Sequence, residues 1–208
     1  MRAVQPLSAV ILLSGGGTTF QNLLEQMRNG SLAIDIRGVL SSRPDAFGLV
    51  RARGANVPTN VVPRREFMDA RSFSREVFKR INAVKPDLLV LAGFMCLLHL
   101  PDRYIGRTVN IHPGLLPKFG GKGMYGIHVH EAVIKAREKV SGCTVHYVDN
   151  EYDHGPIILQ KTVPVEPNDT PQTLMDRVML VEREAYPEAI NMIADGRVRY
   201  ENGQTVFA

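Results

Sequence analysis

The sequence has 208 residues, of which 44% are hydrophobic and 22% charged, and its formal net charge is +4. A chain of this length and composition can bury a sizeable core in one domain, as soluble globular proteins do. Its basic residues are scattered among acids and form no stripe with interleaved aromatic residues, so we expect no nucleic-acid partner.

Short apolar runs alternate with helical patterns along the first half of the chain. A strand buried on both faces is continuously apolar, whereas a helix repeats its apolar residues every three or four positions. The predicted strands are residues 7–13, 34–40, 88–91 and 109–111, and the helical segments are residues 20–29, 46–53 and 65–84. This order predicts an α/β fold with a doubly wound, mostly parallel sheet.

The pattern changes after Pro113, where a loop rich in glycine and proline extends to Gly126. Beyond it we predict a helix at 129–136, strands at 144–148 and 157–165, a helix from Pro171 to Ile193 capped by Thr170, and a hairpin at Asn202-Gly203. The two strands are separated only by the turn 150–155, which makes this C-terminal portion of the sheet antiparallel.

The glycine-rich segment between the first strand and the first helix is a candidate phosphate site. Backbone N–H groups at a helix N-terminus bind anions, and glycine lets a phosphate approach closely. The segment follows the carboxyl end of a strand, where open α/β sheets bind ligands. A tight turn capped by threonine is the alternative. The residues are Gly15, Gly16, Gly17, Thr18 and Thr19.

A single phosphate fits this segment better than a dinucleotide does. The dinucleotide fingerprint requires glycine where this chain has Phe20, and an acidic residue at the end of the second strand, whereas Asp35 lies near its start. No Gly-Lys-Ser/Thr follows, which excludes a P-loop.

Asn110 and His112 form the candidate catalytic pair. Strand alternation places both on one side at the end of a buried strand, where an amide and an imidazole can stabilise an oxyanion. His112 could instead bind a metal. However, no partner with ligand spacing lies beside it, and we expect His128 and His130 to belong to a separate loop. We therefore expect no metal.

Two further segments can belong to the site only if the fold brings them to it. Asp153 lies in a turn, where aspartate is common for structural reasons. If the fold brings it beside His112, its carboxylate would favour the imidazolium. The apolar segment 91–98, which leaves the fourth strand, either walls a pocket or packs in the core.

The two cysteines, Cys96 and Cys143, lie far apart in the sequence. Arg2 precedes the apolar stretch 9–13, but this stretch is too short for the hydrophobic region of a typical secretory signal. No run approaches the roughly 20 apolar residues of a membrane span. We therefore expect reduced thiols, a cytoplasmic location and no membrane partner.

Together, these motifs resemble those of the phosphoribosylglycinamide formyltransferase family over nearly the whole chain. The resemblance rests on residues 14–18, 90–95, 110–113, 115–118, 144–148 and 153–158. Asn-x-His-Pro with a later aspartate is shared by folate formyltransferases in general. It therefore identifies the chemistry more than the acceptor.

The resemblance implies a reaction in purine biosynthesis, in which the amine of glycinamide ribonucleotide attacks the formyl carbon of 10-formyltetrahydrofolate. Asn110 and a protonated His112 would stabilise the oxyanion, and Asp153 would support that charge and help remove the amine's proton. The glycine segment would hold the phosphate and Glu182 the ribose hydroxyls. The folate would contact Arg71, Met95, Cys96, Leu97, Leu98 and Asn110.

The resemblance also implies one formyltransferase domain over residues 1–208. Residues 1–105 would form its phosphate-binding half, and residues 106–208 its catalytic and folate-binding half. Many members carry Arg where this chain has Cys96, and Gly16 and Thr19 stand where Asn is common. The glycine-containing loop 119–130 is longer than in the shorter members, which indicates either a lid or a tolerated surface insertion.

Related activities remain as alternatives. A formyltetrahydrofolate hydrolase would use the same three residues with water as acceptor, but we expect it to carry an additional N-terminal domain. The methionyl-tRNA enzyme would need a further C-terminal domain and a basic RNA face. A sugar-nucleotide N-formyltransferase differs in its acceptor pocket, and a silent nucleotide-binding module would not need the three residues. The choice of monomer or homodimer and the preferred folate polyglutamate length stay open.

Overall fold

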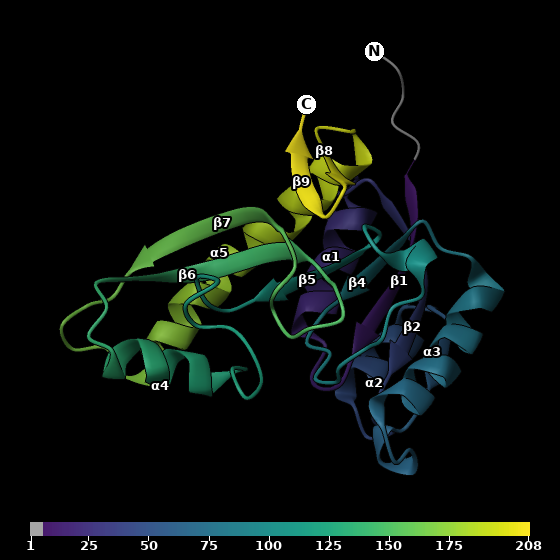
Figure 1. The fold of residues 1–208 in the computed structure, drawn as a ribbon, viewed down its shortest axis with the longest axis horizontal. Coiled ribbons are helices and arrows are strands. Elements are labelled where there is room, and N and C mark those ends of the chain that lie inside the picture. The colour runs from purple at the N-terminus through teal and green to yellow at the C-terminus, as the bar shows by residue number, and fades with distance from the viewer. Residues whose placement is uncertain (1–5) are drawn as a thin grey trace.

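A computed structural model describes residues 6–208 and shows one large sheet with a separate C-terminal hairpin (Figure 1). The seven strands of the sheet lie in the order β3-β2-β1-β4-β5-β6-β7, and β8 pairs with β9. The strands are β1 Leu7–Leu13, β2 Ile34–Ser41, β3 Thr59–Val61, β4 Leu88–Leu91, β5 Thr108–His112, β6 Val140–Tyr147, β7 Ile157–Pro164, β8 Val198–Glu201 and β9 Gln204–Phe207. The α-helices are α1 Thr18–Arg28, α2 Phe47–Gly54, α3 Ala70–Val84, α4 Ile127–Lys135 and α5 Pro171–Ala194.

The sheet changes direction at β5. Strands β3, β2, β1, β4 and β5 are parallel, whereas β5–β6 and β6–β7 are antiparallel. The mostly parallel sheet with an antiparallel C-terminal portion is therefore confirmed. Figure 1 shows the long β6–β7 ribbon with α4 on one side of the molecule, and β1, β2 and α3 on the other.

Alternate residues of β1 pack into two separate cores. Ala9, Ile11 and Leu13 join the cluster that holds the buried residues of α1, α2, α4 and α5. Val10 and Leu12 join the cluster under α3. Burying a side chain of this size stabilises a fold by about 1.5–3 kcal/mol. Because both faces are covered, β1 must be continuously apolar, and this explains why the sequence pattern revealed it.

Three local predictions differ from the structure. Strand β3 was not predicted, because it has three half-buried residues at the sheet edge. Helix α3 begins at Ala70 rather than at residue 65, since Asp69 caps it by accepting a hydrogen bond from Ser72 N at 2.7 Å. Strand β6 begins at Val140 rather than at residue 144.

The expectation that His128 and His130 lie in a loop is wrong. Both are on α4, which begins directly after Gly126, and His130 is fully buried. Its apolar neighbours on the helix, Val129 and Val133, are buried as well, so this face of α4 points into the core. Among the helices of residues 6–208, none combines the length and apolar character needed to cross a membrane.

Strand register brings the candidate residues to one edge of the sheet. Leu12 of β1 is level with Leu91 of β4, and Leu91 is level with Asn110 of β5. The loops that leave these parallel strands therefore emerge side by side. On the far side of β5, the antiparallel register pairs Asn110 with His146 of β6.

Candidate active site

The structure brings Asp153 beside His112. The Nδ1 atom of His112 lies 3.5 Å from Oδ2 of Asp153, and both side chains are largely buried. Asp153 comes from the turn between β6 and β7 and has a left-handed backbone with φ of 52°. Aspartate tolerates this conformation better than most residues. The turn therefore places a carboxylate at the end of β5.

The loop 113–126 is attached to this pair by two backbone hydrogen bonds. His112 Nε2 donates to the carbonyl oxygen of Phe119 at 2.7 Å, and Gly121 N donates to Asp153 Oδ2 at 3.0 Å. A carbonyl only accepts, so Nε2 carries a proton. At Gly120, a side-chain Cβ would lie only 3.0 Å from Cβ of Asp153. Glycine at this position therefore lets the loop close over the carboxylate.

His146 is a site residue for which the sequence analysis had no role. Its Nδ1 donates to the carbonyl oxygen of Tyr147 at 2.8 Å, so its Nε2 accepts the hydrogen bond from Asn110 Nδ2 at 3.2 Å. The same Nε2 lies 3.7 Å from Asp153 Oδ1. Among residues 6–208, no protein group takes the second hydrogen of this amide, which remains available for a ligand. The antiparallel pairing of β5 with β6 places His146 opposite Asn110, and a prediction of this pairing would have identified His146.

Burial sets the charge state of the pair. It lowers the pKa of His112, and this effect outweighs the opposing effects of Asp153 and the Phe119 carbonyl. Burial alone would raise the pKa of Asp153, but the neighbouring His146 and His112 and the N–H of Gly121 lower it overall. At neutral pH the site without substrate therefore holds a neutral imidazole and an ionised carboxylate.

This charge state makes the pair a proton acceptor. With Nε2–H donated to Phe119, the unprotonated Nδ1 of His112 faces the ionised carboxylate of Asp153. Two acceptors at this distance repel each other, whereas a proton between them would be shared by both. The site can therefore take up one proton during a reaction.

The glycine segment follows β1, at the same edge of the sheet as this pair, with β4 between β1 and β5. Gly17 is the N-cap residue of α1 with φ of 71°, and no side chain caps the helix. The threonine-capped turn is therefore excluded. A Cβ on Gly17 would lie 2.6 Å from Cα of Gly48, so the segment packs directly on α2. Gly15 and Gly16, together with Thr18, are exposed at the helix start, where N–H groups attract anions.

Glu182 lies on α5 next to the first turns of α1. Asn22 of α1 donates from Nδ2 to the carbonyl oxygen of Arg183 at 2.9 Å, which fixes this proximity. Burial raises the pKa of Glu182 to about 7. Its carboxyl is therefore about half charged near neutral pH, on the side of the sheet where the glycine segment begins α1.

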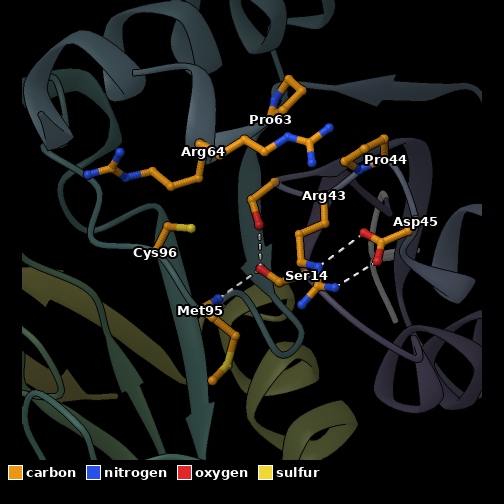
Figure 2. A pocket seen from close by; sticks show the side chains of 10 residues that line it. Ser14, Arg43, Pro44, Asp45, Pro63, Arg64, Met95 and Cys96 are labelled. Atoms are coloured by element: carbon orange, nitrogen blue, oxygen red, sulfur yellow. Dashed lines mark hydrogen bonds and ion pairs between the residues drawn. The ribbon is translucent and has the colours of Figure 1, made fainter. Parts of the chain in front are cut away.

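The residues expected to contact a folate separate into three environments. Met95 and Cys96 line a hollow of about 700 Å³, shown in Figure 2. Leu97 is partly buried, whereas Leu98 is almost completely buried and packs in the core under α3. Arg71 lines a second hollow of about 600 Å³ along α3.

Ser14 connects the glycine segment to the loop that follows β4. Its backbone N donates to Gly93 O at 3.0 Å, and its Oγ accepts from Met95 N at 2.9 Å. The hydroxyl is also 2.7 Å from Oγ of Ser42, at the end of β2. The loops at the ends of β1, β2 and β4 are thus held together by one buried serine.

Within residues 6–208, no group of three or more His, Cys, Asp or Glu side chains could hold a metal ion. The observed groups serve a different chemistry. An amide N–H can stabilise an oxyanion, and a neutral imidazole with a carboxylate can accept a proton. An amide, a proton-accepting pair and an exposed helix N-terminus at one edge of the sheet are the groups that a group-transfer enzyme with an anionic substrate would use.

Comparison with known proteins identifies the family. A model of the formyl transferase family matches residues 7–190. The phosphoribosylglycinamide formyltransferase of Escherichia coli (strain K12) is 37% identical, over 94% of this chain and 92% of the relative. The chain belongs to the formyl transferase family, in its phosphoribosylglycinamide formyltransferase branch.

Solved structures agree with this assignment. The phosphoribosylglycinamide formyltransferase from Coxiella burnetii superimposes with a TM-score of 0.89 at 42% identity, covering 97% of this chain and 93% of that one. Glycinamide ribonucleotide transformylase 1 from Symbiobacterium toebii gives a TM-score of 0.90 at 36% identity, covering 99% and 95%. The resemblance that the motifs indicated is confirmed.

Proposed function

We propose that this protein transfers the formyl group of 10-formyltetrahydrofolate to the amine of glycinamide ribonucleotide. The products are formylglycinamide ribonucleotide and tetrahydrofolate, in a step of purine biosynthesis. The observation that carries the proposal is the convergence of Asn110, His112 and Asp153 at the sheet edge that also carries the exposed glycine segment. The names of the relatives support the choice of acceptor.

The first step creates a negative charge at the formyl oxygen. The amine nitrogen attacks the formyl carbon, and the carbonyl electron pair moves onto the oxygen. The N–H of Asn110 that faces no protein group donates to this oxyanion, while His146 holds the other N–H. Because the amide is already oriented by β6, the hydrogen bond strengthens with charge at no cost in reorganisation.

The second step moves protons. The attacking amine becomes an ammonium in the tetrahedral intermediate and loses a proton toward Asp153 and the Nδ1 of His112, the two acceptors 3.5 Å apart. The proton makes His112 an imidazolium, which the ionised carboxylate stabilises. Collapse of the intermediate breaks the bond to N10 of the folate, and N10 takes up one proton. One proton therefore leaves the amine and one reaches the leaving nitrogen.

The remaining residues would position the substrates. Thr18 and Thr19, with the preceding glycines, would hold the ribonucleotide phosphate, and Glu182 would accept hydrogen bonds from the ribose hydroxyls. Met95, Cys96 and Leu97 would wall the donor. The pocket thus combines residues 1–105 with residues 106–208 in one domain. We expect a cytoplasmic monomer or homodimer with two small-molecule substrates and no resident metal.

An assay with both substrates tests this function. We expect release of tetrahydrofolate that depends on glycinamide ribonucleotide, with formylated ribonucleotide formed in equal amount. Equal release without the amine would indicate a hydrolase and contradict the proposal. Binding of both ligands without turnover would indicate a silent module. Turnover only with an amino sugar nucleotide would replace the acceptor while keeping the chemistry.

A further inference from the structure

A row of three residues crosses the antiparallel part of the sheet beside the candidate active site. His112 of β5 lies opposite Thr144 of β6, and Thr144 lies opposite Gln160 of β7. Residues directly opposite each other in an antiparallel pair point to the same face of the sheet. Thr144 and Gln160 therefore share a face with the imidazole that accepts the proton, although the proposed mechanism uses neither of them.

The hydroxyl of Thr144 is buried and uses its full hydrogen-bonding capacity. Its Oγ1 donates to the carbonyl oxygen of Gly114 at 2.7 Å. It accepts from Leu116 N at 3.1 Å and from Nε2 of Gln160 at 2.9 Å. A hydroxyl has one proton and two acceptor lone pairs, so all three positions are occupied. Thr144 is therefore a fixed junction between the sheet and the loop 113–126.

The amide of Gln160 completes this junction. Its Nε2 donates one hydrogen to Thr144 and the other to the carbonyl oxygen of Leu116 at 3.0 Å. Both the N–H and the C=O of Leu116 are thus bound by these two side chains. Gln160 itself is exposed on β7, so a substitution there removes the two hydrogen bonds without opening a cavity in the core.

Leu116 transmits the constraint to the site. Its side chain is buried against Gly120, where an added Cβ would collide with Cδ2 of the leucine. Gly120 is flanked by the two residues that contact the site, since the Phe119 carbonyl accepts from the imidazole and Gly121 N donates to the carboxylate. The positions of both groups therefore depend on how Leu116 is held.

The Phe119 carbonyl decides which ring nitrogen of His112 bears the proton. A neutral imidazole has one N–H, and the carbonyl oxygen at 2.7 Å requires it at Nε2. If the carbonyl moved away, the proton would be more stable on Nδ1, where it can form a charge-assisted hydrogen bond to Asp153. Nδ1 would then have no lone pair for the proton of the substrate amine.

We propose that Gln160 is a positioning residue for the proton acceptor of the reaction. Through its hydrogen bonds to Thr144 and Leu116, it holds the loop that keeps the proton of His112 on Nε2 and leaves Nδ1 free. The effect on rate rests on the proposed function, which supplies the amine. The effect on the position of the proton requires no substrate.

Histidine 15N NMR of the protein without substrates tests the position of the proton, because a protonated ring nitrogen and a bare one have very different shifts. The signals of His112 are assigned by their absence in His112→Asn. We expect the proton at Nε2 in the unaltered protein. In Gln160→Met, which keeps the length of the side chain but has no donor, the Nδ1 and Nε2 shifts should approach each other because both tautomers are populated.

Steady-state kinetics gives the second readout. Gln160→Met should lower kcat about tenfold, since it removes two hydrogen bonds of ordinary strength, while the KM of each substrate stays within about twofold. Gln172→Met makes the same substitution at an exposed residue of α5 that donates to Asp176 and not to the loop. This variant should keep both the kcat and the histidine shifts of the unaltered protein.

Two variants of Thr144 test the junction itself. Thr144→Ser keeps the hydroxyl and should retain kcat within about threefold, whereas Thr144→Val removes it and should lower kcat at least as much as Gln160→Met. Thr144→Val leaves the carbonyl of Gly114 without its partner, so urea unfolding is needed to show that the variant is folded. Equal activity of the two folded variants would contradict the proposal.

The remaining outcomes also decide. A proton at Nδ1 of His112 in the unaltered protein would overturn the proposal without any variant. If Gln160→Met lowered kcat while the proton stayed at Nε2, or changed neither, Gln160 would have no positioning role. If the shifts changed as expected but the unaltered protein transferred no formyl group, the proposed function alone would fail.

Discussion

The two ends of the proposed substrate site are built by different means. At the end of β1, the glycine segment offers main-chain groups, and its shape depends on the close contact between Gly17 and Gly48. At the end of β5, the site consists of side chains from a strand, its antiparallel neighbour and a distant turn. A main-chain site tolerates changes of side chain but not an added Cβ where the backbone is left-handed. A site made of side chains tolerates substitutions of neighbouring residues but not of the residues that form it.

We expect the largest effect on activity from a substitution at the end of β5, where the site consists of side chains. Asp153→Asn keeps an oxygen that can accept from Gly121 N, so we expect the variant to fold and to bind both substrates. It removes the negative charge that would stabilise the imidazolium of His112 during the reaction, and kcat should fall about 10³-fold. Asp149→Asn, in the same turn, alters a carboxylate paired with His154 and should retain kcat within about twofold. Steady-state kinetics of both variants would test this contrast, and an active Asp153→Asn would show that the carboxylate is not essential.

The main-chain end should respond through stability. Gly17→Ala introduces a Cβ at φ of 71° that would lie 2.6 Å from Cα of Gly48. We expect about 2–4 kcal/mol of destabilisation and a higher KM for the ribonucleotide. Gly15→Ala is the matched control, because its Cβ would meet no atom within 4 Å. Urea unfolding of the two variants measures the difference, and equal midpoints would show that the segment can move away from α2.

Glu182 makes the stability of the folded protein depend on pH. Its pKa is raised by burial to about 7, so the folded protein keeps a proton that the unfolded chain loses at lower pH. Stability due to this group therefore falls as pH rises from about 4.5 to about 7. Glu182→Gln should be about 3 kcal/mol more stable than the unaltered protein at pH 8, and equally stable at pH 4. Thermal unfolding without ligands, followed across this range, would show parallel curves if Glu182 had an ordinary pKa.

The smallest effect should be that of Thr19→Val. The substitution removes a hydroxyl but retains the backbone N–H at the start of α1. If main-chain groups hold the phosphate, the KM for glycinamide ribonucleotide should rise less than about threefold. A much larger rise, without a change in kcat, would mean that the threonine side chain is a principal phosphate ligand. The end of β1 would then resemble the end of β5 in depending on side chains.

The sequence predicted the parts of the fold that hydrophobic patterns describe. Strands β1 and β4 are buried on both faces and therefore appear as apolar runs, and α5 begins at Pro171, directly after its capping residue Thr170. The short edge strand β3 has no such pattern, because three residues at an edge need little burial. The start of α3 was misplaced because periodicity continues past the cap at Asp69.

The sequence pattern predicted the site only where its residues lie close together along the chain. Asn110 and His112 lie two residues apart on one strand, so alternation alone places them together. The contact between His112 and Asp153 spans 41 positions and depends on the reversal of the sheet at β6, which no local pattern encodes. The same reversal brings His146 to Asn110, and the buried environment of His112 lowers a pKa that the neighbouring carboxylate alone would raise.

The contacts of Ser14 would affect the reaction rate. Through its N–H and its hydroxyl it fixes the spacing between the glycine segment and residues 93–95. These two loops would hold the acceptor and the donor, so the serine would set how closely the attacking nitrogen approaches the formyl carbon. Effective molarity depends steeply on such distances, and a displacement of about 1 Å can cost about 10²-fold in rate. A buried hydroxyl that takes part in no bond-making step would in this way act as the spacer between two reactants.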